Sequence, residues 1–151
     1  MQISIVAAGR LRSGPELDLI GMYLKRLPWT VRIIEVEERR PLTGHERQMS
    51  EAALFLRALP AGAYLVALDE SGTKFDSRGF AARLGAWQDS GLNHVAFVIG
   101  GALGLADSFR GEARELISFG RMTWPHMLVR VMLTEQLYRA GAILSSHPYH
   151  K

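Results

Sequence analysis

Short apolar runs rich in β-branched residues alternate with helix-like segments along the whole chain. The runs predict strands at 3–8, 31–36, 64–68, 95–99 and 116–122. Between them, early prolines, acidic first turns and helical apolar spacing predict helices at 15–27, 43–58, 107–115 and 126–144, and one after Asp76. This alternation is typical of an α/β fold, in which a parallel sheet is covered on both faces. Ligands of such sheets bind beyond the carboxyl ends of the strands, here Gly9, Asp69, Gly100-Gly101 and Met122-Thr123.

Apolar spacing assigns a buried face to several predicted helices. Asp76 is an expected N-cap of a helix that buries Phe80, Leu84 and Trp87. The predicted buried stripe of the helix at 43–58 comprises Met49, Ala53 and Leu56 and continues to Leu59 just after it. The last helix is apolar nearly all round, which favours burial against a second subunit.

The composition fits one soluble domain spanning residues 1–151, with 48% hydrophobic residues. The absence of cysteine excludes disulfides, thiolate metal sites and a cysteine nucleophile. The longest uncharged stretch, 90–106, is too short and too polar to span a membrane, and the first residues lack the basic lead of a secretory signal. We therefore expect a cytoplasmic protein without membrane contact.

The net charge is a modest +3, and fifteen of the eighteen basic residues are arginine. Arginine suits phosphates and base edges, although a compositional bias of the lineage explains the excess equally well. From Met122 onward the only acid is Glu135, which favours an anionic partner for this part of the chain. Arg130 and Arg139 fall on roughly opposite faces of the last helix. Either one faces a ligand or partner subunit and the other faces RNA, or both are solvated.

Two segments after predicted strands are candidate ligand sites. Gly100-Gly101-Ala102-Leu103-Gly104 would let backbone N–H groups bind an anion or an adenine edge, or would simply form a tight turn. Residues 119–125 would wrap a flat ring between Met122 and Trp124, or would plug the core beside a turn.

The histidines near the end of the chain do not predict a metal site. No Asp or Glu follows Glu135 to complete a ligand set with His147 and His150. The residues from His147 to Lys151 combine imidazole, aromatic and cationic groups that would stack on a base and contact phosphate, unless they are a disordered or expression-derived tail. No Ser-His-Asp order or carboxylate pair supports hydrolysis.

Several motifs together resemble one bacterial family. VIGGALGL at 98–105 and TWPHMLVRVMLTEQLYRAGAILSSHPYHK at 123–151 carry most of the likeness, and MQISIVAAGRL at 1–11, YLKRL at 23–27 and LVALDESG at 65–72 add to it. The chain resembles, over its full length, the ribosomal RNA large subunit methyltransferase H family. These are small SPOUT-class enzymes that methylate N3 of a pseudouridine in 23S rRNA.

The resemblance implies a parallel-sheet SPOUT fold with a C-terminal trefoil knot, a rare exception to unknotted topology. It also implies a homodimer that acts on 23S rRNA within the assembled ribosome, with S-adenosyl-L-methionine as cofactor and no metal. Cofactor contacts are implied at Leu68, Gly100, Gly101, Phe119, Gly120, Arg121, Met122, Thr123 and Trp124. One departure is Leu103, where the family often has a polar residue.

The implied chemistry asks little of side chains because a sulfonium methyl group is already activated. The enzyme has to align the acceptor nitrogen with it and help remove the imino proton. A histidine of near-neutral pKa can take or relay that proton. The catalytic candidates are therefore His150 and Tyr149, with Arg139 and His126 positioning or polarising the base.

Two other functions remain open at this point. A ribosome-binding factor would keep the knot and lack methyl transfer, and Leu103 is the only feature that favours it. A Rossmann-like or flavodoxin-like nucleotide binder would need a phosphate loop after the first strand, of which Gly9–Gly14 is a poor version.

Overall fold

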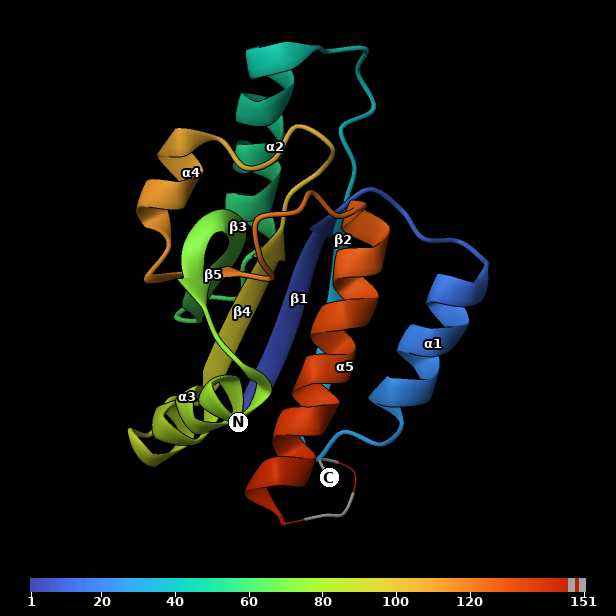
Figure 1. Cartoon of the computed structure of the whole chain (residues 1–151). Helices are drawn as coiled ribbons and strands as arrows, with labels where there is room; N and C mark the ends of the chain where they lie inside the picture. The colour runs from blue at the N-terminus through green and yellow to red at the C-terminus, as the bar shows by residue number, and fades with distance from the viewer. Residues whose placement is uncertain (147–148, 150–151) are drawn as a thin grey trace.

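All five strands lie in one parallel sheet in a computed structural model, which describes residues 1–146 and 149 (Figure 1). The strands are β1 (Gln2–Ala8), β2 (Thr30–Val36), β3 (Tyr64–Lys74), β4 (His94–Ile99) and β5 (Glu115–Ser118). Their order in the sheet is β2-β1-β4-β3-β5. The helices are α1 (Pro15–Leu24), α2 (Gly44–Ala58), α3 (Ser77–Asp89), α4 (Asp107–Glu112) and α5 (His126–Leu144). The predicted α/β class with a parallel sheet is confirmed.

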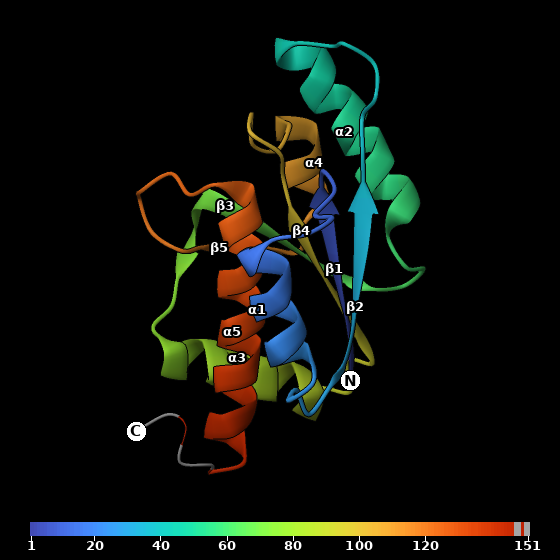
Figure 2. The ribbon, with the colours of Figure 1, turned by 90° about the vertical axis from the view of Figure 1, so that its right-hand side faces the viewer.

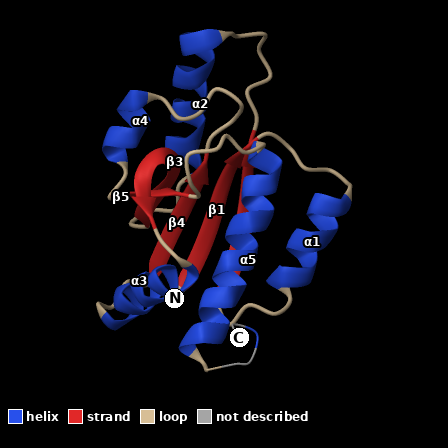
Figure 3. Cartoon of the chain, viewed as in Figure 1, coloured by secondary structure: helices blue, strands red, loops and turns tan. Residues whose placement is uncertain are grey.

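Helices cover both faces of the sheet, as Figures 2 and 3 show. Alternate residues of β1 enter different cores: Ile5 belongs to the core under α3 and α5, and Val6 to the core under α2 and α4. A strand buried on both sides carries no polar face, which explains the continuous apolar runs of the sequence. Helix α1 lies outside α5, where the rings of Tyr23 and Tyr138 are 5.9 Å apart.

The third strand continues beyond its predicted end at Leu68. After an irregularity between Leu68 and Thr73, the strand resumes pairing with β5 at Thr73 and Lys74. The polar residues between them were predicted to end the strand, but Gly72 lies so close to β5 that a Cβ there would be 2.5 Å from the backbone nitrogen of Ile117. The missing side chain lets the two backbones touch. The trefoil knot itself stays a prediction.

The fifth strand ends earlier than predicted, at Ser118 rather than residue 122. The Ser118 hydroxyl accepts a hydrogen bond from the N–H of Gly120 (3.0 Å) and donates one to its carbonyl oxygen (3.1 Å). This local turn removes the chain from the sheet and starts the loop that leads to α5.

The predicted buried stripe of α2 is wrong. Met49 and Leu56 are 41% and 49% exposed, whereas Glu51, Ala52 and Phe55 form the buried face. Phe55 decides the orientation because its ring packs against Phe109 of α4, with centroids 5.3 Å apart. A rule that locates the buried face of a helix by counting apolar residues does not find a face that contains a carboxylate.

The predicted cap and core of α3 are confirmed. Asp76 accepts a hydrogen bond from the N–H of Gly79 at 2.6 Å, and Phe80, Leu84 and Trp87 are buried. Among the described helices, none is long and apolar enough to cross a bilayer.

Candidate functional site

A cleft of about 870 Å³ opens at the carboxyl edge of the sheet, between the ends of β3, β4 and β5 and the start of α5. It gathers eight of the nine predicted cofactor contacts, and His126 as well. The eight are Leu68, Gly100, Gly101, Phe119, Gly120, Met122, Thr123 and Trp124. Arg121 is exposed and does not line the cleft. The roles of these residues stay predictions, but the structure brings together segments that are far apart in the sequence.

Exposed apolar side chains surround this cleft. Leu103 is 46% exposed, Met122 is 73% exposed and Trp124 is 39% exposed, and all three line it. Exposed apolar groups that gather around a concave site are typical of ligand binding. The expectation that Met122 and Trp124 form walls, rather than a core plug, agrees with this exposure.

The glycine loop between β4 and α4 is held in place from the side of α2. The amide of Gln48 donates a hydrogen bond to the carbonyl oxygen of Leu103 at 2.6 Å. Within the loop, the N–H of Gly104 donates to the carbonyl oxygen of Gly101 at 3.0 Å. A Cβ on Gly101 would lie 2.9 Å from Oε2 of Glu51, so a larger residue would push the loop away from α2.

Asp69 brings a buried negative charge to the irregularity that follows Leu68 in β3. Its Oδ1 accepts a hydrogen bond from the N–H of Ser71 (2.9 Å), and its Oδ2 lies 3.3 Å from Nη1 of Arg110. Burial alone would raise the pKa of Asp69, but the bonds from Ser71 and the charge of Arg110 outweigh it, so the pKa lies below its ordinary value. The carboxylate therefore stays ionised in the cleft.

His126 is the titratable group best placed for proton transfer. It is half-buried at the first residue of α5 and lines the cleft. Burial lowers its pKa below 6.5, and the nearby charge of Arg130 adds to this, while Glu51 opposes it. The imidazole is therefore neutral at pH 7 and able to accept a proton.

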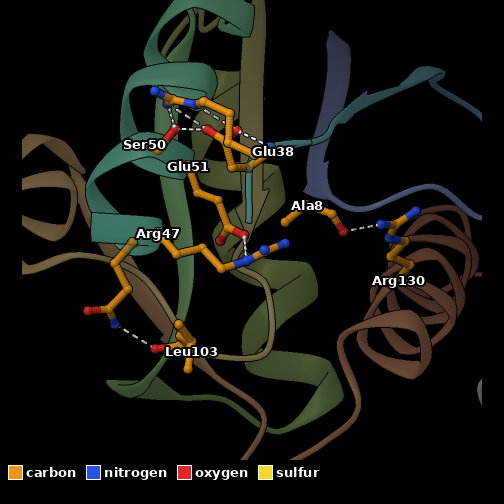
Figure 4. A network of polar contacts seen from close by, with 9 residues as sticks. Ala8, Glu38, Arg47, Ser50, Glu51, Leu103 and Arg130 are labelled. Carbon is orange, nitrogen blue, oxygen red and sulfur yellow. Dashed lines mark hydrogen bonds and ion pairs between the residues drawn. The ribbon is translucent and has the colours of Figure 1, made fainter. Parts of the chain in front are cut away.

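Arg130 is neither solvated nor turned toward a partner or RNA, which corrects the expectations for this residue. It is 1% exposed, and its guanidinium donates to the carbonyl oxygen of Ala8 (Figure 4). The same guanidinium donates to the carbonyl oxygen of Gly9 and to Oε1 of Glu35. The bond to Gly9 is 2.7 Å long and the bond to Glu35 is 2.8 Å long. Arg130 thus fixes the carboxyl end of β1 against α5.

Arg139, on the second half of α5, forms a separate cluster with Tyr149, which lies beyond the end of that helix. Nη2 of Arg139 lies 2.6 Å from Oε1 of Glu135, which also accepts a hydrogen bond from the Tyr149 hydroxyl at 3.2 Å. Burial, a hydrogen bond with Tyr23 and the charge of Glu135 raise the pKa of Tyr149 to about 12, so the phenol keeps its proton at neutral pH. Neither residue lines the cleft, and His150 lies outside the described residues.

The sequence analysis missed the side chains that support the cleft from behind. Gln48 and Glu51 lie on α2, a helix in which the sequence analysis predicted no ligand-binding residue. The available signal was a glutamate on the face that also carries Phe55. Within residues 1–146 and 149 there is no group of three histidines or acids suited to holding a metal ion.

Residues 1–150 match the sequence profile of the family described as "Predicted SPOUT methyltransferase". The chain belongs to the SPOUT methyltransferase family. Among its SPOUT relatives, a protein of Paramagnetospirillum magneticum named "Ribosomal RNA large subunit methyltransferase H" is 53% identical, with 100% of this chain and 99% of the relative covered. A protein of the same name from Rhodospirillum centenum is 52% identical with the same coverage.

Solved structures share the SPOUT fold at low sequence identity. A probable methylase family protein from Haemophilus influenzae matches with a TM-score of 0.61 and 13% identity, over 99% of this chain and 70% of that one. A putative methyltransferase from Legionella pneumophila, solved with the cofactor SAM bound, matches with a TM-score of 0.51 and 12% identity, over 93% of this chain and 67% of that one.

Proposed function

We propose that this chain transfers a methyl group from S-adenosylmethionine to ribosomal RNA. The observation that carries the proposal is the single cleft that gathers eight of the nine residues implied as cofactor contacts. The names of relatives more than half identical over the full length support the same activity. The SAM-bound Legionella protein supports the choice of cofactor through its similar fold.

The residues of the cleft fit this methyl donor. Leu68, Ile99 and Trp124 offer apolar walls to an adenine ring, and the glycine loop offers main-chain hydrogen bonds. Asp69 and Glu70 place negative charge near the cationic sulfonium and ammonium groups. When bound, S-adenosylmethionine supplies a methyl group that is already activated by its sulfonium sulfur.

The protein's own task is alignment and proton removal. The residues that line the cleft would hold S-adenosylmethionine so that its methyl group could pass to the lone pair of the acceptor nitrogen, with the electron pair of the carbon–sulfur bond left on sulfur. The imino proton leaves the nitrogen, and the neutral imidazole of His126 accepts it. Alignment of the nitrogen with the methyl group supplies most of the acceleration.

The specific target in this proposal is N3 of a pseudouridine in 23S rRNA of assembled ribosomes, which in bacteria places the activity in the cytoplasm. A net charge of +3 supports recognition of a folded ribosomal site rather than tight binding to any RNA.

The proposal includes a homodimer in which α1 and α5 meet their counterparts. Leu19, Met22 and Leu128 are 41%, 37% and 38% exposed on these helices, and Leu19 lines an apolar groove of about 640 Å³. Arg139 lies about 20 Å along α5 from His126, at a rise of about 1.5 Å per residue. Arg139 and Tyr149 therefore act, in this proposal, on the cleft of the partner subunit rather than on their own.

Three experiments test the proposed function. Titration calorimetry with S-adenosylmethionine is expected to show binding at no more than about one per subunit, whereas no binding would contradict the proposal. Mass mapping of 23S rRNA is expected to show one methyl group missing in cells that lack the protein, and restored by the intact chain.

Deletion of residues 146–151 is expected to abolish transfer while cofactor affinity stays nearly unchanged.

A further inference from the structure

A smaller cavity of about 360 Å³ lies beside the cofactor cleft. Gly101, Ala102, Leu103 and His126 line both of them, so they are neighbours with a common wall. The other lining residues come from the end of β1 and from the start of α2 and the loop before it. They are Ala8, Gly9, Leu42, Thr43, Gly44, Arg47 and Glu51.

Glu51 gives this cavity an unusual chemical character. Its side chain lies on the buried face of α2 and is 5% exposed as a residue. A buried carboxylate is unfavourable unless charged or hydrogen-bonding groups compensate it. Arg47 compensates only Oε1, from 3.1 Å, and no hydrogen-bond donor among the described residues reaches Oε2. One oxygen of a buried acid is thus left to accept a hydrogen bond from a ligand.

The wall of the cavity at Gly9 packs closely against the start of α5. Gly9 has φ +82°, and a Cβ there would be 3.4 Å from Nε2 of His126 and 3.3 Å from Cε of Met127. Arg130 donates a hydrogen bond to the carbonyl oxygen of Gly9. Among the described residues, Glu51 and Arg130 are the two charged residues that are buried, at 5% and 1% exposed. Glu51 lines this cavity, and Arg130 binds Gly9, which also lines it.

We propose that this cavity receives the acceptor base and that Glu51 and Arg47 read its edge. The inference rests on the proposed function, because it assigns the second substrate of the same reaction. The imidazole of His126, in the common wall, would then lie between the acceptor base and the methyl donor. The volume is at the lower end of the range of about 300–1,000 Å³ usual for small-molecule sites, as a single base requires.

The charges of the pair match a pseudouridine better than a uridine. Both bases offer carbonyl oxygens to the guanidinium of Arg47. Pseudouridine is joined to its ribose through carbon, so its ring nitrogen N1 keeps a hydrogen that uridine lacks. Oε2 of Glu51 accepts that N1–H, while N3–H is the proton lost in the reaction. Glu51 is therefore a specificity-determining residue in this proposal.

The test compares methyl transfer to ribosomes that carry pseudouridine or uridine at the target position, for the wild type and Glu51→Gln. The amide keeps the shape and a weaker, uncharged acceptor, so the ratio of kcat/KM for pseudouridine over uridine is expected to fall about tenfold. The calorimetric affinity for S-adenosylmethionine is expected to stay within about twofold. An unchanged ratio, or an equal loss on both substrates together with lost cofactor affinity, would overturn the proposal.

A second variant tests the cavity without touching the ion pair. Thr43 lines the cavity and its side chain makes no capping hydrogen bond, so Thr43→Trp fills the space without removing a contact. We expect KM for ribosomes to rise about tenfold with cofactor affinity unchanged, and His45→Trp, an exposed neighbour outside the cavity, to leave KM unchanged. Equal KM values for the two variants would exclude the cavity as the base site. A wild type that methylates neither ribosome would instead refute the proposed function.

Discussion

Arg130 joins three parts of the chain through one guanidinium group: the end of β1, Glu35 of β2 and its own helix, α5. Removing one partner of a buried ion pair leaves the other groups unsatisfied and costs about 3–5 kcal/mol. We expect Arg130→Met to lower the free energy of unfolding by about that amount in urea denaturation. Arg139→Met on the same helix breaks a partly exposed pair, and its expected cost is below about 1 kcal/mol. Equal losses for the two variants would contradict the role assigned to Arg130.

His126 couples the stability of the fold to pH. Its pKa is lowered in the folded chain, so the unfolded chain binds more protons between that lowered value and 6.5. Its contribution to stability is present above pH 6.5 and is lost as the pH falls toward the folded pKa. The free energy of unfolding should therefore drop less between about pH 7.5 and pH 5.5 in His126→Gln than in the wild type. The exposed His45→Gln serves as the control and should leave the drop unchanged.

At the scale of elements, the close approach of the β3 and β5 backbones depends on Gly72. A Cβ at this position would lie 2.5 Å from backbone atoms of Leu116 and Ile117. The backbone of β5 cannot move away from it without losing its pairing with β3. We expect Gly72→Ala to destabilise the protein by about 1–3 kcal/mol, as overpacking does. Gly111→Ala in α4 has open space around it and should be neutral or stabilise by up to about 1 kcal/mol. Thermal unfolding of the two variants checks this, and equal stabilities would refute the close approach.

The sequence predicted the elements whose side chains obey a simple period. The runs that became β1 and β4 are apolar because both faces are buried, and α3 has its cap at Asp76 and its core at Leu84. Two features escaped prediction because their cause lies in partners distant in sequence. The third strand resumes after its polar stretch because β5 pairs again with Thr73 and Lys74, and α2 turns Glu51 inward because Phe55 packs on α4.

The backbone segments that line the candidate site were predictable from the sequence, but the side chains that hold these segments in place were not. Glycine and aromatic segments after strand ends mark the cleft, since parallel strands bring their carboxyl ends to one edge. The sequence marked Asp69 only by its position after an apolar run and Glu51 only by the face it shares with Phe55, because the significance of both acids comes from burial beside Arg110 and Arg47.

At the scale of the whole molecule, the exposed apolar side chains of α1 should control subunit association. Leu19→Glu places a carboxylate in the proposed interface, where its burial costs several kcal/mol. We expect the dimer dissociation constant to rise at least about tenfold in sedimentation equilibrium, and methyl transfer to fall in parallel. Leu56→Glu on α2, across the sheet, is the matched control, because Leu56 is similarly exposed and should leave association unchanged. Loss of association in both variants, or in neither, would contradict an interface through α1.

The segment Ile117–Gly120 separates the cofactor cleft from the apolar groove beneath α1 and α5, and the same four residues line both. A ligand that orders this segment from one side changes the affinity of whatever binds on the other side. Thermodynamic reciprocity requires the two effects to be equal in magnitude. In the proposed homodimer, binding of the methyl donor and pairing of two chains are therefore one linked equilibrium, in which each event reports on the other.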